Sequence, residues 1–135
     1  MEKKYKYLTE GKIDPEQILS GLKNNEQITE AGAQFIFIGR VRSDIVNGLE
    51  VKSLLYSAYA EMAERVIGEI REEIINEYKL TGLEIIHGIG NIKAGEISFY
   101  VSGVSTHRGR TSEAVDMTVK RIKKEVPVWK KDVFN

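Results

Sequence analysis

The sequence predicts an α+β fold in which antiparallel hairpins pack against about three helices. The predicted elements follow the order β, α, β, β, α, β, β, α. Short turns join neighbouring strands where a parallel sheet would need crossover helices. The chain has 135 residues, of which 41% are hydrophobic, and this is enough to bury a core. We therefore expect a single domain over residues 1–135.

The first elements are predicted to be a short strand and a helix. Residues 4–8 have the composition of a strand. Asp14 is a suitable N-cap, and Pro15 fits the first helical position because its missing N–H has no partner there. The helix is expected to run to about residue 23.

A hairpin is predicted next. Residues 32–42 are apolar and rich in β-formers, which is typical of a central strand, and Arg40 and Arg42 mark its exit. Asp, Asn and Gly residues favour a turn or loop over residues 43–50. Residues 51–59 are then expected to return beside the first strand.

A long helix and a second hairpin follow. Apolar residues recur at helical spacing from residue 60 to about residue 79, with Glu and Arg on the other face. Residues 83–89 and 97–105 are predicted strands, and residues 91–95 supply the turn between them.

The last predicted element is a helix over residues 111–125, ended by Pro127, whose ring disfavours helical geometry in the preceding residue. Helical spacing places Lys123 on the flank of an apolar stripe, so we expect it to be half buried. The stripe consists of Val115, Val119, Ile122 and Val126.

Composition excludes several classes of function. Lys and Arg total 20 and so do Asp and Glu, so the chain has no broad basic field and a general nucleic-acid binder is disfavoured. No segment approaches the roughly 20 apolar residues of a membrane span, and we expect a cytoplasmic protein. The absence of cysteine excludes disulfides, thiolate metal sites and a persulfide on the chain. With two well-separated histidines, no metal or other cofactor is expected.

The C-terminal third carries the candidate chemistry. Residues 85–135 hold nine basic and five acidic side chains, which suits an anionic ligand, although a solvated helix face has the same composition. His107 and Arg108 lie at a strand-to-helix junction, where a phosphate can be held. Trp129 suits stacking on a flat ring, although core or interface roles are commoner for tryptophan. His87, inside an apolar strand, is interpreted as structural.

Several segments together resemble the family of molybdopterin synthase large subunits, over about residues 30–132. The order and spacing of these segments carry the resemblance. They are Gly32-Ala33, Gly39-Arg40-Val41-Arg42, Tyr56 to Ala63, His87-Gly88-Ile89-Gly90 with Gly95-Glu96, Ser105-Thr106-His107-Arg108, and Lys123 with Pro127 to Asp132.

The resemblance implies a hammerhead-like fold and a sulfur transfer to cyclic pyranopterin monophosphate, which yields the dithiolene of molybdopterin. It implies that Lys123 and Lys130 are catalytic, one acting on the thiocarboxylate and the other in proton transfer, in either assignment. Arg42, His107 and Arg108 would hold the phosphate and pterin. The rest of the pocket would come from Arg40, Val41, Lys131 and Asp132.

The resemblance also implies the partners. The sulfur would arrive on the C-terminal Gly-Gly thiocarboxylate of a small ubiquitin-like sulfur-carrier subunit, and a homodimer of the large subunit would form the centre of a heterotetramer. A cysteine-free chain fits a borrowed sulfur, since the large subunit then needs only to orient and polarise two anionic substrates.

Two other functions remain open on the sequence. A basic C-terminal helix also suits a non-catalytic module that docks an acidic protein or RNA, in which case Lys123 and Lys130 would tolerate exchange for Arg. A different enzyme of similar fold could use the same cationic pocket on another phosphorylated substrate, without a ubiquitin-like partner.

Overall fold

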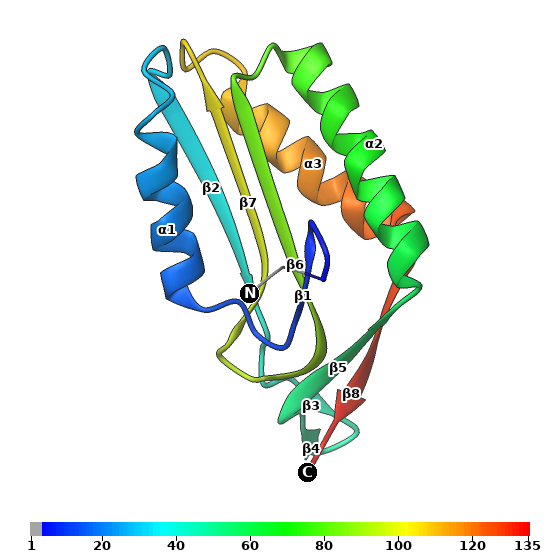
Figure 1. Cartoon of the computed structure of the whole chain (residues 1–135). Coiled ribbons are helices and arrows are strands. Elements are labelled where there is room, and N and C mark those ends of the chain that lie inside the picture. The colour runs from blue at the N-terminus through cyan, green and yellow to red at the C-terminus, as the bar shows by residue number, and fades with distance from the viewer. Residues whose placement is uncertain (1–3) are drawn as a thin grey trace.

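The computed structural model describes residues 4–135, and within them lie three α-helices and eight β-strands (Figure 1). The helices are α1 (Pro15–Asn25), α2 (Ala60–Tyr78) and α3 (Thr111–Glu125). The strands are β1 (Leu8–Glu10), β2 (Ala33–Arg40), β3 (Ile45–Val46), β4 (Leu49–Glu50), β5 (Ser53–Ala58), β6 (Gly82–Lys93), β7 (Ile97–Ser105) and β8 (Val128–Val133).

The main sheet has the strand order β2-β7-β6-β5-β8, with β1 added beside β6. All pairs along this order are antiparallel, and only the short β1 runs parallel to its neighbour. The long strand β6 joins the two halves of the sheet, because Gly82 to His87 pair with β7 whereas Gly90 to Lys93 pair with β5. The predicted α+β class is confirmed.

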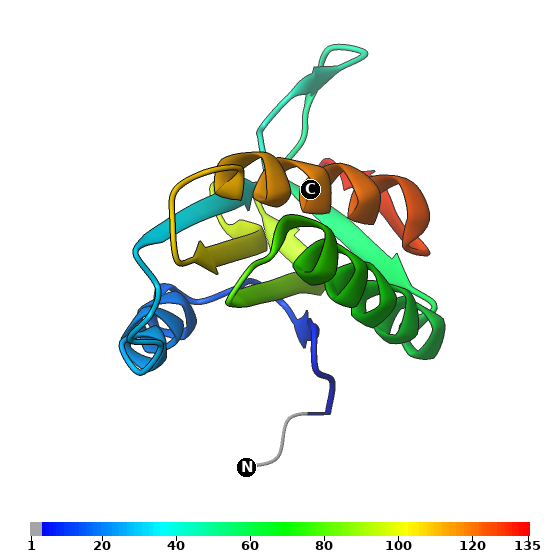
Figure 2. The same ribbon diagram turned by 90° about the horizontal axis from the view of Figure 1, so that it is seen from above.

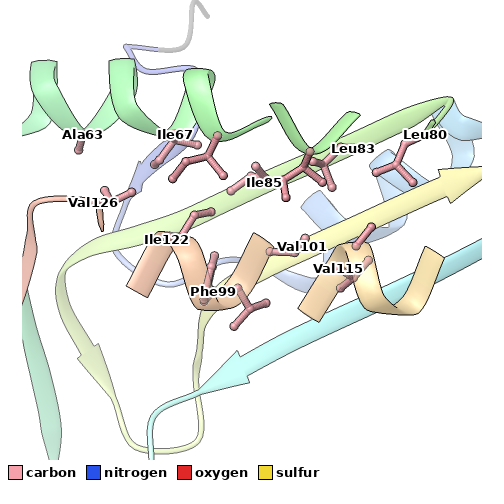
Figure 3. Packing of buried hydrophobic residues seen from close by; sticks show 14 of the residues in the cluster. Ala63, Ile67, Leu80, Leu83, Ile85, Phe99, Val101, Val115, Ile122 and Val126 are labelled. Carbon is pink, nitrogen blue, oxygen red and sulfur yellow. The ribbon is translucent and has the colours of Figure 1, made fainter. Parts of the chain in front are cut away.

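The main core lies between the sheet and the helix pair α2 and α3 (Figure 3). Ile67 of α2 and Ile122 of α3 meet Ile85 of β6 and Phe99 of β7 there. Each such side chain contributes about 1.5–3 kcal/mol by leaving water. Helix α1 packs on a separate cluster with Tyr100. The two helices of the main core run side by side, apart from α1 (Figure 1).

Most predicted helices and strands are confirmed with small differences at their ends. Helix α1 begins as expected, and Gln17 reinforces its start by accepting a hydrogen bond from the Asp14 backbone N–H at 2.8 Å. Helix α3 and strand β7 have the predicted bounds. The first strand was expected over residues 4–8 but forms at Leu8–Glu10, because the backbone N–H groups of residues 6–8 donate to the Glu64 carboxylate.

The first predicted hairpin is wrong. Strand β2 pairs with β7, and the returning strand β5 pairs instead with β6 and β8. The second hairpin, β6 with β7, is confirmed, but β6 continues to Lys93 through part of the predicted turn. Strand β8, which follows Pro127, was missed altogether. The residues expected to form a loop contain the small hairpin β3–β4, which projects from the rest of the chain (Figure 2).

No helix in residues 4–135 has the length and apolar character needed to cross a membrane.

Candidate active site

A cavity of about 580 Å³ opens where the end of α3 meets β8, β5 and the ends of β2 and β7. Four basic side chains and two carboxylates are among the residues that line it, together with aromatic and apolar side chains. The lining residues are Phe37, Gly39, Arg40, Arg42, Asp44, Val51, Leu54, Tyr56, His87, Ser98, Phe99, Ile122, Lys123, Val126, Val128, Trp129, Lys130 and Asp132.

Pro127 brings the two lysines to the same cavity. Val126 before it is extended (φ −86°, ψ 132°), so α3 ends and the chain turns back as β8. Strand β8 pairs with β5 in a register that sets Lys130 opposite Tyr56. Lys123 occupies the last turn of α3, where the negative end of the helix dipole favours a cation. Both lysines therefore border the same space from different elements.

Lys123 is exposed in the structure, so the predicted half-burial is wrong. The apolar stripe of α3 is buried as expected, but the Lys123 side chain points into the open cavity, where Phe37 lies below it. The ammonium nitrogen is 5.9 Å from the centre of the Phe37 ring. This cation–π contact contributes about 0.5–1 kcal/mol at an exposed position and limits where the ammonium can move.

The two arginines are held by neighbours within the chain. Arg40, the last residue of β2, donates a hydrogen bond of 2.8 Å to the carbonyl oxygen of Gly95. Arg42 lies 3.5 Å from the Asp44 carboxylate, and both of these side chains are mostly exposed. Such an exposed ion pair contributes little energy, so Arg42 remains available for an anionic ligand.

The floor of the cavity is aromatic. The His87 ring packs between Tyr56, at 5.3 Å between centroids, and Phe99, at 5.0 Å. Burial lowers the pKa of His87 below its ordinary value, and the nearby charge of Lys123 lowers it further, while a hydrogen bond to Gly88 acts in the opposite direction. The floor is therefore aromatic and uncharged beneath a rim of cations.

The structure brings together five of the predicted site residues: Arg40, Arg42, Lys123, Lys130 and Asp132. Lys131 is exposed and does not line the cavity. Val41 is buried in a small core cluster with Val51, between the two arginines that flank it in sequence.

His107 and Arg108 lie at the opposite end of the β2–β7 ladder. Ala33 pairs with Ser105 at that end, whereas Arg40 pairs with Ile97 at the cavity end. Phe99 and Ser105 are six positions apart on the extended strand β7, a span of about 20 Å. Within one chain these two residues are therefore remote from the cavity.

A network of buried hydroxyl groups fixes the loop that carries His107 and Arg108. The Thr111 hydroxyl donates to the Arg108 carbonyl at 2.7 Å and also contacts the hydroxyl of Ser105. The Ser105 hydroxyl in turn donates to the carbonyl of His107. These hydrogen bonds tie the loop to the start of α3.

Sequence reasoning missed several cavity residues, notably Tyr56, Phe37 and Asp44. A signal for Tyr56 was present, since it begins one of the segments that carry the family resemblance. Trp129 is 59% exposed at the cavity, so it is not a core residue and its ring can contact a ligand. Phe37 has the pattern of an ordinary core residue, and only the fold places it beneath Lys123.

The arrangement suits an anionic ligand that carries a flat ring. Cations at the rim stabilise negative charge, and the aromatic floor and Trp129 accommodate a planar group. Within residues 4–135, no group of three or more His, Asp or Glu side chains is positioned to hold a metal ion.

Comparisons with known proteins identify what the chain resembles. The family described as MoaE protein matches residues 8–125. The molybdopterin synthase catalytic subunit of Thermoplasma volcanium is 34% identical over 96% of this chain and 91% of its own length. That of Bacillus subtilis is also 34% identical, over 94% of this chain and 78% of its own length.

Solved structures agree in fold. The crystal structure of molybdopterin synthase from Staphylococcus aureus is similar with a TM-score of 0.83 and 28% identity, over 99% of this chain and 94% of that one. A complex of subunits 1 and 2 of molybdopterin-converting factor from Helicobacter pylori has a TM-score of 0.81 over 96% of this chain and 84% of that one. At 19% identity, the second likeness concerns the fold alone.

Proposed function

This chain belongs to the MoaE protein family of molybdopterin synthase catalytic subunits, and we propose that its cationic cavity is the site of sulfur transfer. The chain takes part in molybdenum cofactor biosynthesis. Sulfur passes from the C-terminal thiocarboxylate of a small ubiquitin-like subunit to cyclic pyranopterin monophosphate, and the product is the dithiolene of molybdopterin. In this proposal residues 1–135 act as a single catalytic domain.

The convergence of Lys123, Lys130, Arg40 and Arg42 on one cavity carries the proposal. Both substrates are anions, one through its phosphate and the other through its thiocarboxylate. Cations positioned before the reaction stabilise the charge that develops during transfer without having to reorganise. The negative charge of both substrates therefore complements the positive charge of the site.

The lysines have different surroundings, which suggests different roles. Lys123 lies above Phe37 near the buried floor, and we assign it to the thiocarboxylate. Lys130 lies on β8 opposite Tyr56, and we assign it to proton transfer at the pterin side chain. Asp132, on the same face of β8, would orient one of these cations.

A second copy of the chain would complete the site with His107 and Arg108. Strand β2 lies at the end of the strand order, and its Ile36 and Ile38 side chains are 39% and 41% exposed. If two β2 strands pair antiparallel about a twofold axis, the Arg40 end of one lies beside the Ala33 end of the other. That end is where the second copy holds its His107 and Arg108, within reach of the first cavity.

The remaining assignments follow from the same proposal. The homodimer would carry one small sulfur-carrier subunit at each cavity, giving a heterotetramer. Lys131, which is exposed and does not line the cavity, is assigned to the rim that meets the carrier. Val41 would act by packing between Arg40 and Arg42. We place the protein in the cytoplasm, which fractionation of cells would test.

Reconstitution tests the function directly. The purified chain is mixed with cyclic pyranopterin monophosphate and with the carrier in either its thiocarboxylate or its plain carboxylate form, and molybdopterin is measured. Product is expected only with the thiocarboxylate. If a folded, carrier-bound chain gives no product, the proposed function is wrong.

A Lys130→Arg variant separates catalysis from simple docking. Arg keeps the positive charge but cannot act as a proton donor and acceptor near neutral pH. The proposal predicts that the variant binds the carrier but has little turnover. A docking module would bind its partner normally with either Lys or Arg at this position.

A further inference from the structure

The histidine at the floor of the cavity has one ring nitrogen occupied and one available. His87 is 8% exposed and lines the same cavity as Lys123 and Lys130. Its Nδ1 lies 2.8 Å from the carbonyl oxygen of Gly88. A carbonyl only accepts hydrogen bonds, so Nδ1 must carry a proton. In the neutral ring Nε2 then has a free lone pair, and within residues 4–135 the structure shows no hydrogen bond to it.

The surroundings of His87 keep the ring neutral at pH 7. Tyr56 and Phe99 pack against it, and Lys123 is the charged group that acts on it from the neighbouring helix. Burial, the largest effect, and this positive charge both lower the pKa of His87, and the hydrogen bond to Gly88 opposes them. Nε2 is therefore an acceptor under ordinary conditions.

This acceptor differs from the charged side chains of the cavity. Arg40, Arg42, Lys123 and Lys130 can only donate when charged. The carboxylates of Asp44 and Asp132 accept hydrogen bonds, but both are charged and lie at exposed positions, and Asp44 is paired with Arg42. An uncharged acceptor at an aromatic floor matches an N–H group on the flat, neutral part of a ligand.

We propose that His87 determines specificity for the heterocycle: its Nε2 accepts a hydrogen bond from a ring N–H of the pterin, while the cations bind the phosphate. The inference rests on the proposed function, because it takes a pterin phosphate as the ligand of the cavity. A phosphorylated compound without this donor would cover the nitrogen without pairing it and would bind more weakly.

Nuclear magnetic resonance of the two histidines tests the tautomer and the contact together. The chain contains only His87 and His107, and a His107→Gln variant assigns their signals. At pH 7.5 we expect His87 with its proton on Nδ1, and an Nε2 resonance that moves when cyclic pyranopterin monophosphate saturates the chain but not with inorganic phosphate. A proton on Nε2, a charged ring, or an Nε2 resonance unmoved by the bound pterin would overturn the proposal.

Two variants test the contribution to catalysis. His87→Phe retains a ring of similar size and removes the acceptor, whereas the amide oxygen of His87→Gln restores an acceptor near the position of Nε2. We expect the KM for the pterin to rise about tenfold or more in His87→Phe and to recover largely in His87→Gln. Circular dichroism and carrier binding establish that each variant is folded.

The outcomes separate this inference from the proposed function. If the native chain makes no molybdopterin, the proposed function fails, and the resonance experiment still decides whether His87 contacts the pterin. If the native chain is active and a folded His87→Phe has the native KM, only the role of His87 is contradicted.

Discussion

At the scale of single residues, backbone carbonyls accept hydrogen bonds from side chains of the proposed site and of the loop that carries His107 and Arg108. Arg40 donates to Gly95, His87 to Gly88 and the Thr111 hydroxyl to Arg108. The backbone at each of these points belongs to a strand, a turn or the start of a helix, so the side chains keep their positions without a ligand. A site organised in this way loses little entropy when its substrates bind.

Removing the Thr111 hydroxyl tests the importance of one such contact. Thr111 is 2% exposed, so a Thr111→Val variant leaves the Arg108 carbonyl and the Ser105 hydroxyl without that partner. We expect the free energy of unfolding to fall by about 1–3 kcal/mol. Urea denaturation measures it, and Ser112→Ala, on the exposed side of the same helical turn, is the control. Equal stability of the two variants would contradict the role of the network.

The depressed pKa of His87 predicts a pH dependence of stability. The unfolded state binds a proton near the ordinary pKa of 6.5, whereas the folded state does so only at lower pH. The contribution of the neutral His87 to the free energy of unfolding is therefore fully present above pH 6.5, and it is lost as the pH falls below that value. Urea unfolding at pH 7.5 and 5.5 should show a smaller loss for His87→Phe than for the native chain. An equal loss in both would contradict the neutral, buried histidine.

At the scale of elements, the end of α3 explains why the two lysines meet. Pro127 ends the helix, and the six residues that follow become β8, an edge strand paired with β5. The helix and its end were predictable, because an apolar stripe and a proline have local signatures. Strand β8 was not, because its sequence Val-Trp-Lys-Lys-Asp-Val is polar at the centre and acquires its pairing only from a strand about 75 residues earlier.

A single carboxylate supports the N-terminal strand in addition to its pairing with β6. Glu64 of α2 accepts hydrogen bonds of 2.7 to 2.8 Å from the backbone N–H groups of Lys6, Tyr7 and Leu8. A Glu64→Ala variant should lose about 1–3 kcal/mol of stability and expose the amides of residues 6–10 to faster hydrogen exchange. Glu77→Ala, an exposed position on the same helix, is the control. Unchanged exchange in Glu64→Ala would show that other contacts hold β1.

At the scale of the whole molecule, long-range pairing separates what the sequence predicts from what it does not. The α+β class and the hairpin of β6 with β7 follow from local patterns and short turns. The expected hairpin of β2 with β5 fails because β6 extends far enough to take β5 as its partner. The residues of the cavity were named from the family resemblance, but the separation of His107 and Arg108 from it appears only in the fold.

Mixed dimers test whether two copies share each site. In the proposed dimer, Lys123→Ala damages the cavity of its own chain, whereas Arg108→Ala damages the site of its partner. Random mixing makes half of the dimers mixed, each with one intact site, so about a quarter of native activity should return. Mixing Lys123→Ala with Lys130→Ala provides the control, since both changes affect the cavity of the same chain and no activity should return. No recovery in the first mixture would contradict the shared site.

The most direct test of the central claim compares lysines inside and outside the cavity. The rate of molybdopterin formation is measured in a single turnover with the thiocarboxylated carrier and the pterin precursor, for Lys123→Ala, Lys130→Ala and Lys124→Ala. Lys124 is an exposed neighbour that does not line the cavity. We predict a loss of about a hundredfold or more in the first two variants and a near-native rate in the third. Native rates in folded, carrier-bound Lys123→Ala and Lys130→Ala would contradict the assignment of the cavity as the site of sulfur transfer.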